Sequence, residues 1–133
     1  MPTFDWRSYL DVARLLADQA DQVPFPEAAY RSAVSRAYYA AYGYALHYAI
    51  SYLGFRPRNR PEDRTQDHGR LRGHLRSRRR AKAALVLDRL RDQRNKCDYV
   101  DDVGKIDPNA LSAAAIQDAD ELIHRLLPPT TSP

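Results

Sequence analysis

An uncharged run of 19 residues, Ala37 to Phe55, restricts the possible folds of this chain more than any other feature. Its length approaches what a helix needs to cross a bilayer. Six tyrosines and two glycines lie in the run, however, and tyrosine within a membrane prefers the interfaces. The run continues a helical pattern that starts at Pro26, and its alanines and tyrosines leave too few polar positions for a solvated face. We predict a packing helix over residues 26–53, central in a bundle or at an oligomer seam, and no membrane span.

Helical periodicity marks four further segments, and no stretch alternates like a strand. The expected helices cover residues 5–21, 66–78, 81–99 and 107–126. Prolines separate or end them because proline cannot continue a helix, and residues 56–65, with two prolines, are expected to form an exposed, mobile loop. We predict an all-α, up-and-down bundle of four or five helices, one domain over residues 1–127, and a disordered tail at 128–133.

The numbers and spacing of the cysteine and histidine residues indicate the cellular compartment of the protein and whether it binds a metal. Cys97 is the only cysteine, so no internal disulfide can form, and the four histidines lack the spacing of a metal site. The N-terminus lacks the basic start and apolar run of a secretory signal. The sequence therefore predicts a cytoplasmic protein without a metal or another cofactor.

Positive charge is concentrated in the middle of the chain. Residues 56–94 hold 14 Lys or Arg and 5 Asp or Glu, a net charge of +9, whereas the remaining residues hold 7 and 12, a net charge of −5. Arginine makes up 13 of those 14 basic residues, and its planar guanidinium suits phosphate. We expect a nucleic-acid-binding surface, the alternative being a solvated face that keeps the protein soluble. The expected contact residues are Arg36, His68, Arg70, Arg72, Arg76, Arg78, Arg79 and Arg80.

Arg94 interrupts the apolar face of the helix predicted over residues 81–99. The residues that share this face at spacings of three and four are Ala83, Leu87, Leu90, Arg94 and Cys97. Burying a guanidinium without an acceptor is costly. Arg94 is therefore expected either to pair inside the protein, for example with Asp98 one turn later, or to open onto a cleft that holds an anion.

Three sequence segments carry a family resemblance. Residues 31–42 read RSAVSRAYYAAY, residues 68–71 read HGRL, and residues 90–99 read LRDQRNKCDY. In this order and spacing they resemble the second helix, the inter-helix segment and the Leu-Arg-x-x-Arg-Asn-x-Ala-Asp-Tyr signature of the HEPN superfamily, in its small stand-alone prokaryotic branch. The resemblance covers most of the chain. It implies a helical bundle that forms a homodimer, with the arginine-bearing helix ends of two protomers meeting in a basic cleft.

The resemblance also implies a function directed at RNA. Active members are metal-independent ribonucleases of toxin–antitoxin and antiviral systems, built around Arg-x4-6-His, in which a ribose 2′-OH attacks the neighbouring phosphate. Arg94 matches the arginine and Asn95 the polar residue after it, whereas Tyr99 stands where histidine is expected. The predicted catalytic residues are Arg94 to stabilise the phosphate, Asn95 to orient it, and Tyr99 to handle protons. His68 or His74, from another helix or from the second protomer, are the alternatives to Tyr99.

Three functions stay open on the sequence alone. The first is a toxin or defence protein that binds RNA and cleaves it. The second is a catalytically inactive module that binds nucleotide or RNA, or that acts with a minimal nucleotidyltransferase, for which Tyr99 is the candidate acceptor of AMP. The third is a structural helical dimer in which Arg94 only pairs with Asp98, and in all three the tyrosines at 38, 39 and 42 are expected to serve packing.

Overall fold

The computed structural model describes residues 4–58, 60–102 and 106–126, and these residues are helical with no strand, as the sequence predicts. The α-helices are α1 (Ser8–Gln19), α2 (Pro26–Tyr52), α3 (Arg64–Ser77), α4 (Ala81–Tyr99) and α5 (Pro108–Arg125). Two short 3₁₀ helices, Ala20–Gln22 and Pro61–Asp63, follow α1 and precede α3. The tail predicted to be disordered, residues 128–133, lies outside the described residues.

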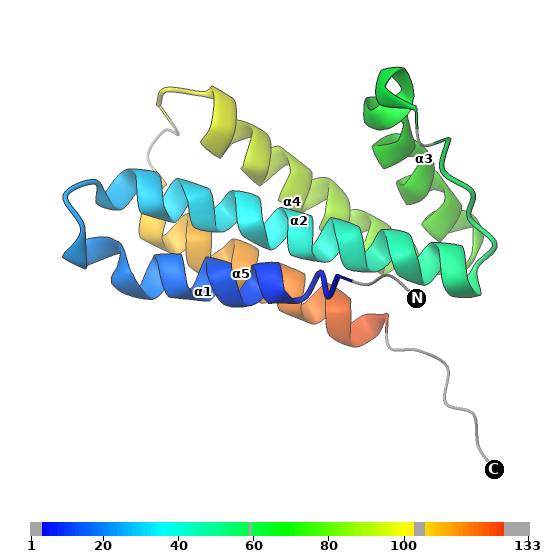
Figure 1. The fold of residues 1–133 in the computed structure, drawn as a ribbon, viewed down its shortest axis with the longest axis horizontal. Coiled ribbons are helices and arrows are strands. Elements are labelled where there is room, and N and C mark those ends of the chain that lie inside the picture. Colours follow the sequence, from blue (N-terminus) through cyan, green and yellow to red (C-terminus); the bar gives the residue numbers. More distant parts are fainter. Residues whose placement is uncertain (1–3, 59, 103–105, 127–133) are drawn as a thin grey trace, which may run out of the picture.

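Four of the helices form the body of the molecule. Figure 1 shows α1, α2, α4 and α5 side by side and alternating in direction. Helix α2 contacts each of the other three, whereas α3 packs chiefly on α4. The chain therefore builds an antiparallel bundle around α2 and adds α3 at one end of it.

Helix α2 is covered on several sides, as its composition predicts. Small residues are buried around its circumference, so neighbouring helices approach closely, and Tyr38 is 1% exposed in its middle. No helix in the described part of the chain is long and apolar enough to cross a membrane. The uncharged run thus packs against protein.

One glycine of α2 is required by packing. A Cβ built on Gly43 would lie 2.1 Å from Cδ2 of Trp6, well inside van der Waals contact. The indole ring therefore lies directly on the backbone of α2. This contact ties the residues before α1 to the middle of the bundle.

The predicted loop over residues 56–65 needs correction. It contains the Pro61–Asp63 turn, and α3 begins at Arg64, two residues before the predicted start. Asp63 is only 6% exposed, and its carboxylate accepts a hydrogen bond from Arg60 Nε at 2.9 Å. The segment is exposed at Arg56, Arg58, Arg60, Pro61 and Glu62, as predicted, but the pairs of Asp63 with Arg58 and Arg60 hold a folded turn within it.

Candidate functional site

Arg94 lies in α4 with its side chain only 13% exposed. Its Nη1 donates to Tyr39 Oη at 3.1 Å, its Nη2 donates to Asn95 Oδ1 at 2.8 Å, and a carboxylate oxygen of Asp98 lies 3.6 Å from Nη1. Its Nε finds no hydrogen-bond partner among the described residues. The internal pairing of Arg94 that the sequence offered as one alternative is therefore present, and it leaves one donor unused.

Three tyrosine rings surround this guanidinium. Its Cζ lies 5.2 Å from the ring centroid of Tyr38, 5.5 Å from that of Tyr39 and 5.7 Å from that of Tyr99, all within the range of cation–π attraction. Tyr38 is buried, whereas Tyr99 is 73% exposed and lies on the solvent side. The three residues predicted to be catalytic, Arg94, Asn95 and Tyr99, thus lie together.

His68 reaches the same tyrosines from α3. Its Nδ1 is hydrogen-bonded to Tyr38 Oη at 2.5 Å, and its ring stacks on Tyr42 with 3.9 Å between the centroids. Burial, and then the positive charge of Arg94 and other arginines, lowers the pKa of His68 to about 4. The imidazole is therefore neutral at pH 7. His74, the alternative histidine, instead bonds a backbone carbonyl at the C-terminal end of α2.

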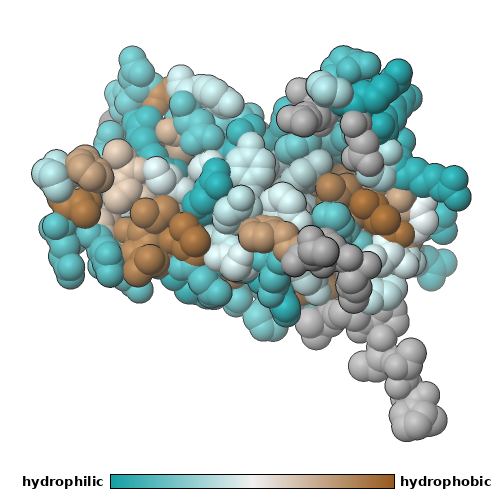
Figure 2. All heavy atoms as spheres, in the orientation of Figure 1, coloured by the Kyte–Doolittle hydropathy of each residue, from teal (hydrophilic) through white to brown (hydrophobic). Residues whose placement is uncertain are grey.

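Helices α2, α3 and α4 meet around this group. Helices α3 and α4 diverge from the turn that joins them and form a V over α2 (Figure 1), and the surface is hollowed between the two arms (Figure 2). His68 belongs to the N-terminal half of α3 and Arg94 to the C-terminal half of α4. Tyr38 of α2 contacts both, so the candidate site joins the three helices.

Further positive charge lies next to this site. The Cζ of Arg36 lies 5.0 Å from the ring centroid of Tyr9 and 5.3 Å from that of Tyr39. Tyr39 therefore contacts the guanidinium groups of both Arg36 and Arg94. Arg91 adds to the field that lowers the pKa of His68. These charges outnumber the carboxylates of Asp98 and Asp67, so the site favours an anion.

The remaining arginines of the predicted surface divide into two groups. Arg72 and Arg76 both pair with Asp88 of α4, and Arg70 Nη1 lies 2.6 Å from Asp67. Their charge is partly neutralised inside the protein. Nucleic acid would therefore have to compete with these carboxylates for the three arginine side chains. The Asp88 pairs could not be predicted from the sequence, because Asp88 lies on another helix.

Arg78, Arg79 and Arg80 form the turn between α3 and α4. Arg80 Nη2 donates to Tyr48 Oη at 3.4 Å, and Tyr48 is ten residues, about 15 Å, further along α2 than Tyr38. Within the described residues Arg78 and Arg79 are exposed and form no ion pair. Arg80 therefore lies about three helical turns of α2 away from the Tyr38–Arg94 group.

Sequence reasoning missed the hydroxyl groups that α2 contributes. Ser35 Oγ donates to Asp98 Oδ2 at 3.3 Å, Tyr39 binds Arg94, and Tyr38 binds His68. The sequence predicts only packing for the tyrosines. The signal available was their spacing, since residues 35, 38 and 39 share one face of a helix.

The site combines a guanidinium, a neutral imidazole and phenol hydroxyls. Such a set can bind a phosphate, accept a proton and donate one. No group of three His, Cys, Asp or Glu side chains suited to a metal ion occurs in the part of the chain that the structure describes.

Comparison with known proteins returned no match among family models, curated proteins or solved structures. The resemblance to the HEPN superfamily therefore stays a prediction from sequence.

Proposed function

We propose that this protein is a HEPN-type, RNA-binding protein of a prokaryotic toxin–antitoxin or antiviral defence system, and that it cleaves RNA without a metal ion. The observation that carries the proposal is the position of Tyr38, which contacts the His68 imidazole through its hydroxyl and the Arg94 guanidinium through its ring. A histidine from α3 thereby stands in for the one that the motif lacks. The same resemblance implies a homodimer.

The chemistry follows from these groups. The 2′-OH of a ribose attacks the adjacent phosphorus, the 2′-O–P bond forms and the P–O5′ bond breaks, which gives a 2′,3′-cyclic phosphate and a 5′-OH. His68 takes the 2′-OH proton at Nε2, which requires the tautomer whose Nδ1–H donates to Tyr38 Oη. Arg94 stabilises the charge on phosphorus, and the exposed hydroxyl of Tyr99 gives a proton to the leaving O5′.

The protonation state of His68 supports this role. A base must be unprotonated before it acts, and the lowered pKa of His68 keeps it so at pH 7. The same low pKa makes it a weak base, so the phosphate-stabilising charge of Arg94 has to supply much of the rate. We therefore expect slow cleavage, in which loss of Arg94 costs more than loss of His68.

Cleavage of single-stranded RNA in the presence of EDTA tests the proposal. The wild-type protein should produce fragments with 2′,3′-cyclic phosphate ends, and Arg94→Ala and His68→Gln should lower the rate about 100-fold or more. Two matched variants should retain the wild-type rate: Arg89→Ala, which lies on the same helix as Arg94 but pairs with Asp118 of α5, and His124→Gln on α5. Cutting by Arg94→Ala at the wild-type rate would refute the proposal.

A second candidate rests on the exposure of Tyr99. Its ring is 73% exposed beside Arg94 at the end of α4, where a partner enzyme can reach the hydroxyl. In this role the protein is a catalytically inactive partner of a minimal nucleotidyltransferase that transfers AMP to the phenol. Intact mass after co-expression with the neighbouring gene should then show one added nucleotide that Tyr99→Phe removes. RNA binding without cleavage, together with this mass shift, would favour the second candidate over the first.

A further inference from the structure

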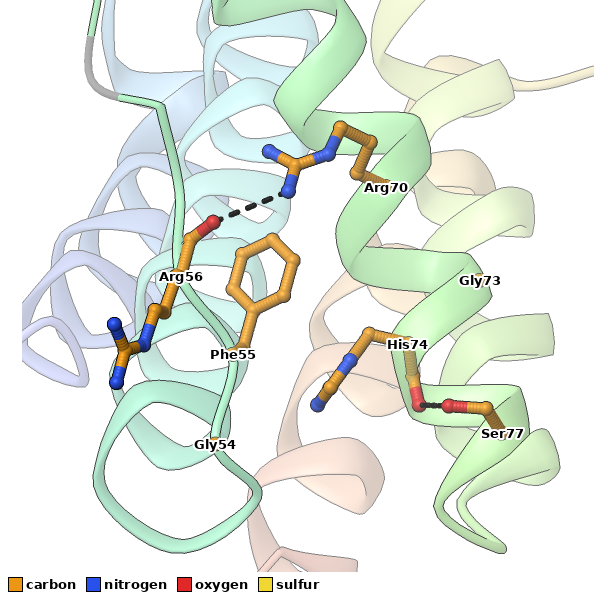
Figure 3. A pocket seen from close by; sticks show the side chains of 7 residues that line it. All are labelled: Gly54, Phe55, Arg56, Arg70, Gly73, His74 and Ser77. Atoms are coloured by element: carbon orange, nitrogen blue, oxygen red, sulfur yellow. Dashed lines mark hydrogen bonds between the residues drawn. The ribbon is translucent and has the colours of Figure 1, made fainter.

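A separate pocket lies between α3 and the segment that follows α2, and its lining includes none of the residues of the Tyr38–Arg94 group. It is about 510 Å³ in volume and is lined by residues 54–56, which follow α2, and by Arg70, Gly73, His74 and Ser77 of α3. Figure 3 shows the Phe55 ring and the His74 imidazole extending into the space between the two segments, with Arg70 above them. The proposed function uses none of these side chains.

The walls of this pocket are held by hydrogen bonds from α3 to the segment after α2. His74 Nε2 donates to the Leu53 carbonyl at 2.6 Å, and Arg70 Nη2 donates to the Arg56 carbonyl at 3.2 Å. The Arg70 guanidinium also lies over the Phe55 ring, 5.5 Å from its centroid. Two backbone oxygens that would repel an anion are thus already occupied by donors.

Positive charge at the rim of the pocket is not neutralised by the protein. Arg56 is exposed, and Arg78 Nη2 lies 4.0 Å from the position of a Cβ built on Gly54. Neither arginine forms an ion pair with a carboxylate in the described ranges, although Arg58 and Arg60 pair with Asp63 nearby. Within the same basic segment, acids neutralise some arginines and leave these two free.

The charge balance favours an anion. The C-terminal ends of α2 and α3 each bring about half a negative charge to the pocket, and Asp67 adds one more through its contact with Arg70. Arg56, Arg70 and Arg78 together carry three positive charges. The pocket therefore keeps a net charge of roughly +1 by this count.

Gly73 leaves the pocket open. No atom lies within 4 Å of a Cβ built on it, so no packing contact inside the protein requires glycine there. Glycine in a helix interior is unfavourable relative to alanine. Glycine at position 73 gains no packing contact, and its lack of a side chain leaves space in the pocket for a ligand.

We propose that this pocket binds a phosphate group, with Arg56 of the lining and Arg78 beside Gly54 as its charged contacts and the bare face of Gly73 as part of its wall. The phosphate comes either from a free nucleotide or from the backbone of an RNA strand. Only the choice between these sources depends on the proposed RNA-directed function, since phosphate binding here needs neither Arg94 nor His68.

Titration with inorganic phosphate, followed by ¹H–¹⁵N NMR, tests the pocket directly. The chain has five glycines, and the amide signals of Gly54 and Gly73 should shift in a saturable manner. Arg56→Gln and Arg78→Gln should each weaken binding about tenfold, and Gly73→Gln should abolish it by filling the space. Absence of a saturable shift in the wild-type protein would overturn the proposal.

Two matched variants separate the pocket from general charge and helix effects. Lys82→Gln removes the same charge from an exposed position of α4, and Gly69→Gln adds the same side chain to α3 outside the pocket lining. Both should bind phosphate as the wild-type protein does, and weakening equal to that of Arg78→Gln or Gly73→Gln would refute a defined site. AMP and a 5′-phosphorylated oligoribonucleotide then identify the source: tighter binding of the oligonucleotide assigns the site to RNA, and equal or tighter binding of AMP assigns it to a nucleotide.

Discussion

At the scale of single residues, the contact with Trp6 restricts position 43 to glycine. Any side chain at position 43 meets the indole at 2.1 Å. Gly43→Ala should therefore lower the free energy of unfolding by about 1–3 kcal/mol, because the ring must leave its position on α2. Urea unfolding followed by circular dichroism measures the difference. The shift should be accompanied by a change in tryptophan fluorescence, since Trp6 is the only tryptophan.

Gly69→Ala provides the matched control. A Cβ there lies 3.7 Å from Arg72 Nη2, an ordinary contact. This variant should be as stable as the wild-type protein or more stable by up to about 1 kcal/mol, because alanine favours the helix. If both variants unfold at the wild-type urea concentration, the Trp6 contact does not constrain position 43.

At the scale of helices, the end of α4 depends on a side chain from α2. The last carbonyl groups of a helix have no partner within it. Arg31 donates to the carbonyls of Val100 and Asp101 at 2.6 Å each and to that of Cys97 at 3.4 Å, and its side chain is only 17% exposed. This arginine therefore fixes the segment that carries Tyr99.

Arg31→Leu should lower the free energy of unfolding by about 2 kcal/mol, since it removes charge-assisted hydrogen bonds from a mostly buried position. Hydrogen exchange should also become faster at the amides of residues 97–101. Arg14→Leu is the control, because the ion pairs of Arg14 are exposed and contribute little. Equal losses in both variants would mean that Arg31 acts only as a surface charge.

Two of the helices that the sequence predicts well, α2 and α5, have local signals at their starts. Pro26 starts α2, and the Asp107 carboxylate caps α5 by accepting from the Asn109 backbone N–H at 3.3 Å. The start of α3 was missed because it depends on pairs such as Asp63 with Arg58, which form only in the folded chain. Local sequence signals therefore predict where a helix begins, except where contacts that form only in the folded chain extend it.

The same division applies to the candidate site. The spacing of residues in α4 is enough to single out Arg94. The position of His68 is not predictable in this way, because it depends on the angle at which α3 packs, and the Tyr38–His68 hydrogen bond joins residues 30 positions apart. The hydrogen bonds of Tyr38 and Tyr39 could not be predicted either. A tyrosine that only packs in the core and one whose hydroxyl also forms a hydrogen bond occupy the same positions in a helical pattern.

At the scale of the whole molecule, His68 links protonation to the docking of α3. Its ring is held between α3 and α2 by Tyr38 and Tyr42, and its pKa is lowered to about 4, whereas an unfolded histidine titrates near 6.5. Between these values the unfolded chain binds a proton that the folded protein does not. The free energy of unfolding should therefore fall as the pH drops from about 6.5 to 4, and His68 should contribute no pH dependence above about 7.

The size of this effect follows from the linkage relation. The full shift corresponds to about 3 kcal/mol, and because the ring is only half-buried we expect a loss of about 1–2 kcal/mol. Urea unfolding at pH 7 and pH 4.5 measures it. Carboxylates titrate in the same range, so the quantity to compare is the loss in the wild-type protein minus the loss in His68→Gln.

That difference should be positive, because the variant has no imidazole to protonate. His124→Gln should match the wild-type protein, since this ring is exposed on α5. The loss of α3 docking should also appear as faster hydrogen exchange in α3 than in α5 at pH 4.5, because α3 packs chiefly on α4 and depends on His68 for its contact with the middle of α2. Parallel pH profiles for the wild-type protein and His68→Gln would show that the imidazole is solvated in solution and that Tyr38 does not hold it next to Arg94.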